Sequence, residues 1–296
     1  MLKRLLAEKT RKSWMLFALA LIVILPFAIG LSLLHKSWPI LADSEFGSVL
    51  FGSDWMPVSG KFGLWPFIVN SVIVTLMGLL FMIPICMAAA IYITQFSPMW
   101  IRRILRTVID ILAGIPSVIF GLWCVITIVP LVAGQAVKAG AENATGYSVL
   151  AAGLVIAVAT IPFVLNMLIE LFESVSMELV ETGLSMGASR WQTIRDIIIK
   201  KTKHGIIAAF SLGVSKAFGE TIAVLMVVGN IVQIPDSVFD AGYPLPALLA
   251  NNYGEMMSIP RYDSALMLSA LILLVIVILF NYFAHKVISH YHLKSS

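Results

Sequence analysis

Two charged residues in an apolar stretch are the first candidates for chemistry. Lys216 and Glu220 lie four positions apart between residues 205 and 232, a stretch that is otherwise mostly apolar. On a continuous helix this spacing places both side chains on one face. A lysine there attracts an anion, and a nearby glutamate keeps the attraction weak enough for release. The alternative interpretation is a self-neutralising pair that only helps the helix pack.

Hydroxyl groups extend this candidate anion path. Thr221 follows Glu220 directly, and Ser117 lies in another apolar run, where each can donate a neutral hydrogen bond. One lysine and one glutamate attract many anions, so the residues themselves leave the substrate open. The sequence contains no phosphate-binding loop of the ATPase type, no zinc-protease motif and no serine-hydrolase motif. We therefore predict no catalytic residue, no metal site and no cofactor.

The composition places these residues in a membrane protein. The 296 residues are 59% hydrophobic and only 12% charged, with a mean hydropathy of +0.96, whereas soluble domains average roughly a quarter charged residues. A bilayer crossing needs about 20 apolar residues. Six runs meet this length: 14–34, 66–94, 104–133, 147–171, 205–232 and 265–284. The prediction is an all-α polytopic membrane fold with six transmembrane helices.

The placement of lysine and arginine sets the predicted orientation. These residues gather before the first run, between the second and third, after the fourth and at the C-terminus. Such a bias marks the cytoplasmic side, so both termini are predicted to be cytoplasmic. Residues 1–62 then hold a basic segment, the first span and an outer loop. Residues 63–296 form a five-span core with a cytoplasmic loop at 173–204. The basic residues flank apolar runs, so we expect no nucleic-acid partner.

The longest polar segment, residues 178–203, has the pattern of two helices joined by a tight turn. Ser189 and Gln192 fit a capping box at the start of the second helix, and Gly187 just before them suits the turn. Helical spacing predicts one apolar side for this helix, formed by Trp191, Ile194, Ile197 and Ile198. The alternative is an amphipathic helix lying on the bilayer surface.

The same segment resembles the EAA motif of ATP-binding-cassette (ABC) importer permeases. That motif has an acidic residue, a glycine six positions on and an apolar residue ten further, which Glu181, Gly187 and Ile197 match. The surrounding ETGLSMGASRWQTIRDIIIKK is similar to the stretch in phosphate-uptake (Pst) permeases. This chain departs from the pattern where threonine and glycine replace the alanines after the glutamate, and where Lys200 replaces the usual closing proline.

Two further stretches resemble the same family. Residues 113–118, AGIPSV, are similar to a signature on its third span. Residues 218–230, FGETIAVLMVVGN, are similar to its fifth-span run, in the PstC-type form rather than the PstA-type form. The family usually has arginine where this chain has Lys216. Arginine binds phosphate through a bidentate fork and lysine acts as a point charge, so the change implies less geometric selectivity.

The resemblance implies a type I ABC importer permease fold and a set of partners. A PstA-like second permease would complete a heterodimeric channel, two cytoplasmic ATP-binding subunits would hydrolyse ATP, and an extracytoplasmic phosphate-binding protein would deliver the substrate. The chain itself would be a multi-pass protein of the bacterial inner membrane and not an enzyme. The residues expected to couple to the ATPase are Glu181, Gly187, Ser189, Arg190, Trp191, Arg195 and Ile197. Those expected along the substrate path are Ser117, Lys216, Glu220 and Thr221.

Two alternatives stay open. One is a permease for another oxyanion, such as sulfate or molybdate. The other is an ion-coupled secondary carrier that works without an ATPase. The residues assign no role to Asp110 or to the long outer loop at 233–263.

Overall fold

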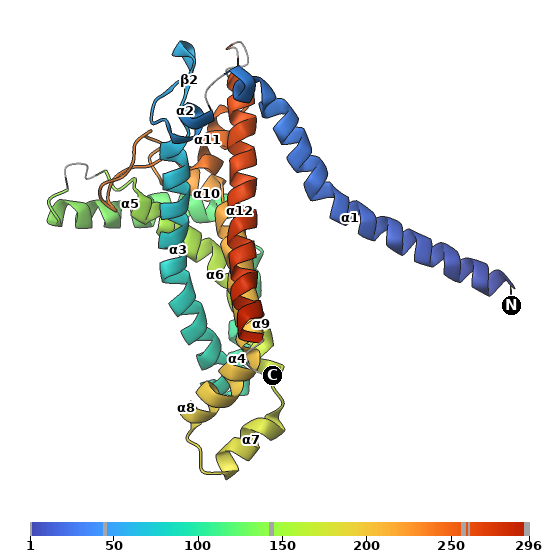
Figure 1. Cartoon of the computed structure of the whole chain (residues 1–296). Coiled ribbons are helices and arrows are strands. Elements are labelled where there is room, and N and C mark those ends of the chain that lie inside the picture. Colours follow the sequence, from blue (N-terminus) through green and yellow to red (C-terminus); the bar gives the residue numbers. More distant parts are fainter. Residues whose placement is uncertain (1, 44–45, 142–144, 256–258, 260, 293–296) are drawn as a thin grey trace.

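The chain forms a bundle of long helices with short elements at its two ends (Figure 1). The computed structural model describes residues 2–43, 46–141, 145–255, 259 and 261–292. The long helices are α1 (Leu2–Asp43), α3 (Trp65–Ile91), α4 (Met99–Ala113), α5 (Ser117–Lys138), α6 (Val149–Glu173), α9 (Lys200–Gly219) and α12 (Tyr262–His292). The shorter helices are α2 (Phe46–Phe51), α7 (Met177–Ser185), α8 (Arg190–Thr193), α10 (Ile222–Leu225) and α11 (Leu245–Asn252).

The remaining elements are tight turns and one small hairpin. A 3-10 turn, η1 (Pro57–Ser59), joins the two antiparallel strands β1 (Trp55–Met56) and β2 (Lys61–Phe62). Two π-helical turns extend longer helices: η2 (Tyr92–Phe96) follows α3, and η3 (Ile194–Ile199) lies between α8 and α9. The hairpin and α2 lie at the end of the bundle opposite α7 and α8 (Figure 1).

Helices α3 and α6 form the centre of the bundle and approach closely because small residues face each other. A Cβ added at Gly78 would lie 2.6 Å from Cγ2 of Ile156, and one added at Gly153 would lie 2.7 Å from Cβ of Met77. Small residues let helix backbones come together where lipid supplies no hydrophobic drive between helices. Helix α9 packs on α6 and α12, and α1 packs on α12.

Helix α1 leaves the bundle and its N-terminal part stands apart from the other helices (Figure 1). Its most apolar window has a mean hydropathy of 2.7 and none of it is buried by the rest of the described chain. An apolar helix of this length without cover in the monomer is suited to lipid or to another membrane helix.

The helices confirm a polytopic helical membrane protein. Among the described residues, five helices are long and apolar enough to cross a membrane: α1, α3 with η2, α5, α6 and α12. Helix α9 packs between α6 and α12 and completes a bundle roughly consistent with the six predicted spans.

The predicted third span, 104–133, is wrong, because the helix breaks at residues 114–116. The spanning helix is α5, from Ser117 to Lys138. Pro116 has no backbone N–H to continue a helix, and it drives Ile115 before it towards extended conformations. Residues 99–113 form instead the amphipathic α4, whose exposed side includes Trp100, Ile104 and Ile111.

The predicted fifth span, 205–232, is also wrong at its end. Helix α9 stops at Gly219, and Glu220 has φ −73° and ψ 111°, which is extended backbone. The chain then forms the short α10 and returns through a loop to α11. The predicted placement of Lys216 and Glu220 on one helical face is therefore wrong.

The long loop between α10 and α11 folds back onto the bundle. A single bridge pairs Gly229 with Gly242, the buried Asn70 side chain on α3 donates to the Gln233 carbonyl at 2.7 Å, and the Leu245 amide donates to Oγ of Ser71 at 2.8 Å. Helix α11 then lies in an apolar cluster with Leu64, Phe67 and Tyr262. The loop is thus a packed part of the fold rather than a plain connector.

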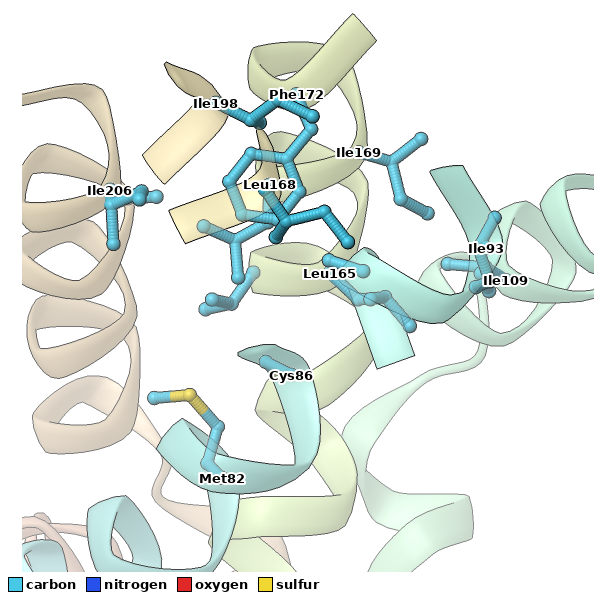
Figure 2. Close-up of a cluster of buried hydrophobic side chains, with 14 of the residues drawn as sticks. Met82, Cys86, Ile93, Ile109, Leu165, Leu168, Ile169, Phe172, Ile198 and Ile206 are labelled. Carbon is cyan, nitrogen blue, oxygen red and sulfur yellow. The ribbon is translucent and has the colours of Figure 1, made fainter. Parts of the chain in front are cut away.

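A second apolar cluster lies where α3, α6 and α9 meet the polar segment (Figure 2). Cys86 of α3 shares this cluster with Leu165 and Leu168 of α6, and Ile198 of η3 lies beside Phe172 (Figure 2). Ile198 is 1% exposed and Phe172 2% exposed. The polar segment is therefore anchored by buried apolar side chains and does not lie free on the surface.

The close approach of α3 and α6 gives a stability prediction. Gly153→Leu should lower the melting temperature of the detergent-solubilised chain, because the new side chain overlaps Met77 and overpacking costs about 1–3 kcal/mol. Gly134→Leu on α5 is the matched control, since an added Cβ there meets no atom within 4 Å. Equal melting temperatures for the two variants would contradict the packing of α3 on α6.

Candidate functional site

The polar segment has the helix, turn, helix arrangement predicted from the sequence. Helix α7 ends at Ser185, and Gly187 adopts φ +87°, the left-handed conformation that glycine takes without strain. The capping box is present. The backbone N–H of Gln192 donates to Oγ of Ser189 at 3.3 Å, and the backbone N–H of Ser189 donates to side-chain Oε1 of Gln192 at 2.8 Å. Residues within the turn therefore determine where α7 ends and where α8 begins.

The glycine that replaces an expected alanine supports the contact between the two arms. Gly183 on α7 is buried, and a Cβ placed there would lie 2.6 Å from Cδ1 of Ile197. Thr193, 3% exposed, donates its hydroxyl to the Ser189 carbonyl at 3.1 Å and lies next to Gly183. The departure from the resembled motif therefore allows α7 to lie close to η3.

The second arm continues into α9 without a break. Backbone angles stay helical at Ile199 and Lys200, where the resembled motif closes with proline. Nζ of Lys200 contacts Asp196 at 2.9 Å, one turn earlier, and Nη2 of Arg195 contacts the same carboxylate at 2.9 Å. The hydrogen bonds from Arg195 and then Lys200 lower the pKa of Asp196 to about 2. A single helical run therefore connects Arg190 to Gly219.

Most of the predicted coupling residues are accessible. Glu181, Ser189, Arg190, Trp191 and Arg195 are exposed, and Ile197 is half-buried. Of the predicted apolar side, Ile194 and Ile198 are buried at 2% and 1% exposure, whereas Trp191 is 57% exposed. The exposed groups leave a charged and aromatic surface around the turn that a partner in water can contact.

An arginine cluster that the sequence analysis did not identify lies beside this segment. Arg102 and Arg106 of α4 both contact the carboxylate of Glu173 at the end of α6. Nε of Arg102 also donates to the Ile93 carbonyl at 3.0 Å, and the same side chain reaches the Thr94 carbonyl. These contacts fix α4 to α6 and to η2. Both arginines were visible in the sequence, but their partner Glu173 lies 67 positions beyond Arg106.

This cluster lines a cavity of about 750 Å³ between α4, η2, the end of α6 and the α7–α8 turn. The polar side chains around it include Thr94, Ser97, Arg103 and Arg190. Its apolar lining includes Phe172, Ile194 and Ile198, which belong to the buried cluster of Figure 2.

The two charged candidates for the path, Lys216 on α9 and Glu220 directly after it, contact different helices. Nζ of Lys216 lies 4.9 Å from the ring centroid of Phe163 on α6, a cation–π contact. Oε1 of Glu220 accepts from the Ala223 amide at 3.4 Å and so faces α10. No ion pair between Lys216 and Glu220 occurs in the part of the chain that the structure describes. Phe163 had no distinguishing signal in sequence.

The two hydroxyl candidates lie near the same break. Oγ1 of Thr221 donates to the Gly219 carbonyl at 3.2 Å. Ser117 is the first residue of α5, and one turn later Gly121 approaches Ala223, since a Cβ there would lie 2.9 Å from the Ala223 Cα. The two helix breaks, after Ala113 and after Gly219, thus bring the starts of α5 and α10 together. Asp110, unassigned from sequence, accepts from the Asn166 side chain at 2.8 Å.

Comparison with known proteins identifies a family for most of the chain. Residues 83–290 match the family described as binding-protein-dependent transport system inner membrane component. The matched range begins inside α3 and includes the α7–α8 segment, α9 and the loop between α10 and α11.

Curated relatives match most of their own length. The phosphate transport system permease protein PstC of Pasteurella multocida is 31% identical over 286 residues, which is 92% of this chain and 87% of the relative. The protein of the same name from Haemophilus influenzae is 32% identical over 275 residues, 88% of this chain and 86% of the relative. A probable ABC transporter permease of Bacillus subtilis, YqgH, is 34% identical over 229 residues, which is 77% of this chain and 72% of the relative.

A solved structure shows a similar fold. An inward-facing conformation of the MetNI methionine ABC transporter superposes with a TM-score of 0.54 at 18% identity, covering 77% of this chain and 94% of that one. At this identity the similarity concerns the fold alone.

The left-handed glycine gives a local prediction. Gly187→Ala should destabilise the turn by about 1–2 kcal/mol, the cost of the left-handed conformation for a residue with a Cβ. Amide hydrogen exchange in residues 187–193 should then accelerate by about 5- to 30-fold. Gly134→Ala on α5 is the control, because an added methyl there meets no atom within 4 Å and its backbone is not left-handed. Unchanged exchange in Gly187→Ala would contradict the strained turn.

Proposed function

The chain belongs to the family of binding-protein-dependent transport system inner membrane components, and on this premise we propose that it is the permease subunit for inorganic phosphate in an ATP-driven importer. The assignment of phosphate as the substrate rests on the similarity to proteins named phosphate transport permeases, over 86–87% of their length. The chain is a permease subunit of an ABC importer, a family in which partner subunits hydrolyse ATP.

In this proposal, energy enters at the exposed surface around the α7–α8 turn. Glu181, Arg190 and Trp191 would contact a groove on the ATP-binding subunit, as a helix-in-groove contact. Gly187 and Ser189 would fix the angle between the two arms, with Ile197 packed on Gly183 and Arg195 holding Asp196. The continuous helical run to Gly219 would then transmit displacement of the turn into the membrane.

The substrate path in this proposal lies around the break after α9. Lys216 would attract the anion, because its charge faces an aromatic ring rather than a carboxylate. Thr221 and Ser117 would add hydroxyl donors, and Glu220 would limit how tightly the anion is held. Displacement of α9 would change the position of Lys216 relative to α10 and α5.

The finer partners and the orientation belong to the same proposal. The monomer would form half of a channel with a PstA-like permease, two ATP-binding subunits would bind on the cytoplasmic side, and an extracytoplasmic phosphate-binding protein would deliver phosphate. Both termini and the α7–α8 segment would face the cytoplasm of a bacterial cell, in agreement with the lysine and arginine distribution.

Reconstitution tests the proposed function. Vesicles that contain this chain, its genomically adjacent permease and ATPase, and the adjacent binding protein should accumulate labelled phosphate only when ATP is supplied on the ATPase side. Preferential accumulation of sulfate or molybdate would replace phosphate as the substrate. Uptake by this chain alone, driven by an ion gradient, would overturn the ABC-importer mechanism.

A substitution at Lys216 tests the path. Lys216→Met should reduce phosphate uptake by at least tenfold, because removing the charge of a charge-assisted contact costs about 1.5–3 kcal/mol. Lys216→Arg, the residue usual in the resembled family, should retain uptake, and Lys201→Ala, an exposed charge away from the path, should have no effect. Uptake by Lys216→Met with unchanged affinity would reduce Lys216 to a packing role against Phe163.

A further inference from the structure

The cavity beside the α7–α8 turn carries more positive charge than its own carboxylate neutralises. Arg102, Arg103, Arg106 and Arg190 line it, whereas Glu173 is the acidic residue among the lining side chains. Glu173 is already shared by Arg102 and Arg106. No carboxylate lies in ion-pair contact with Arg103 or Arg190 within the described part of the chain.

Two polar groups at the cavity also lack partners. Ser97 is only 7% exposed and lines the cavity, yet its Oγ has no hydrogen-bond partner among the described residues. The buried Nε of Arg106 is likewise without a partner there. An unsatisfied buried donor is costly in a folded protein, and both residues line a space large enough to hold a ligand.

We propose that this cavity is a binding site for a phosphate group, with Arg103 and Arg190 supplying charge and Ser97 and Arg106 supplying buried donors. Arginine presents a planar fork of N–H donors that matches phosphate oxygens, and a serine hydroxyl adds a neutral donor. The volume of about 750 Å³ lies within the usual range of about 300–1,000 Å³ for ligand sites. It is ample for hydrated inorganic phosphate or for a phospholipid headgroup.

The site would connect α4 to the start of α8. Arg103 lies on α4 and Arg190 is the first residue of α8. A bound phosphate between them would tie the start of α8 to α4 and so oppose displacement of the coupling segment. If phosphate bound here slows movement of the coupling segment, it would regulate import. This regulatory role rests on the proposed function, whereas phosphate binding itself does not.

The test uses the assembled importer carrying Lys216→Met, so that the proposed transport path does not contribute. Binding of inorganic phosphate is measured calorimetrically in nanodiscs of phosphatidylcholine and of phosphatidylglycerol. Arg103→Ala or Arg190→Ala should weaken binding by about tenfold or more, and Ser97→Ala by about two- to tenfold. Lys201→Ala is the matched control, because it removes an exposed charge that does not line the cavity.

The two lipids separate the sources of the phosphate group. Binding in both nanodiscs identifies free phosphate as the occupant. The anionic headgroup is the occupant if inorganic phosphate binds in phosphatidylcholine nanodiscs but not in phosphatidylglycerol nanodiscs. In that case, native mass spectrometry should also show that the protein retains phosphatidylglycerol and that this retention depends on Arg103. The proposal is overturned if neither phosphate binding nor lipid retention depends on Ser97, Arg103 and Arg190. It is also overturned if the arginine variants only release the ATP-binding subunits. Loss of uptake in reconstituted vesicles is a separate readout, so failure of the proposed function would be recognised independently.

Discussion

The contact on which the structure depends is the burial of Ile194 and Ile198 against the end of α6. These two side chains lie in one apolar cluster with Leu168 and Phe172 of α6 and Cys86 of α3. Burying a branched aliphatic side chain contributes about 1.5–3 kcal/mol. The segment around Gly187 is therefore joined to the membrane helices by close packing, and packed interiors transmit displacement rather than absorb it.

The continuity of η3 with α9 adds a second connection. Lys200 keeps its backbone N–H and forms an ion pair with Asp196 one turn earlier, so the helix does not end where the resembled motif places a proline. A proline there would remove one helical hydrogen bond and crowd the preceding turn. Without it, a partner contacting Arg190 acts on the same helical run that carries Lys216. The departure from the motif thus makes the connection between turn and path more direct.

Much of the fold could be predicted from the sequence, because membrane helices are recognised by their length and apolar composition. The turn was predicted from Ser189, Gln192 and Gly187. The break at Pro116 was also visible in principle, since proline disfavours helix before it. The end of α9 was not: Gly219 and Glu220 lie in a run whose apolar character continues to residue 232. There the chain leaves the helix because Ala223 and Val224 are buried against α5 and α6 instead. The Arg106–Glu173 contact depends in the same way on tertiary packing, which no local pattern records.

The separation of Lys216 from Glu220 changes the electrostatics expected of the path. A neutralised pair would present little net charge to an anion, whereas a lysine over an aromatic ring keeps its full charge, because the ring attracts the cation without cancelling it. Phe163 also limits the positions of the ammonium group that a flexible lysine would otherwise explore. Glu220 accepts a hydrogen bond from the Ala223 amide and so interacts with the start of α10. In the proposed path, attraction and release would therefore involve different elements, α9 and α10. In that proposal, the break at residues 219–220 would let the balance between attraction and release change when one helix is displaced relative to the other.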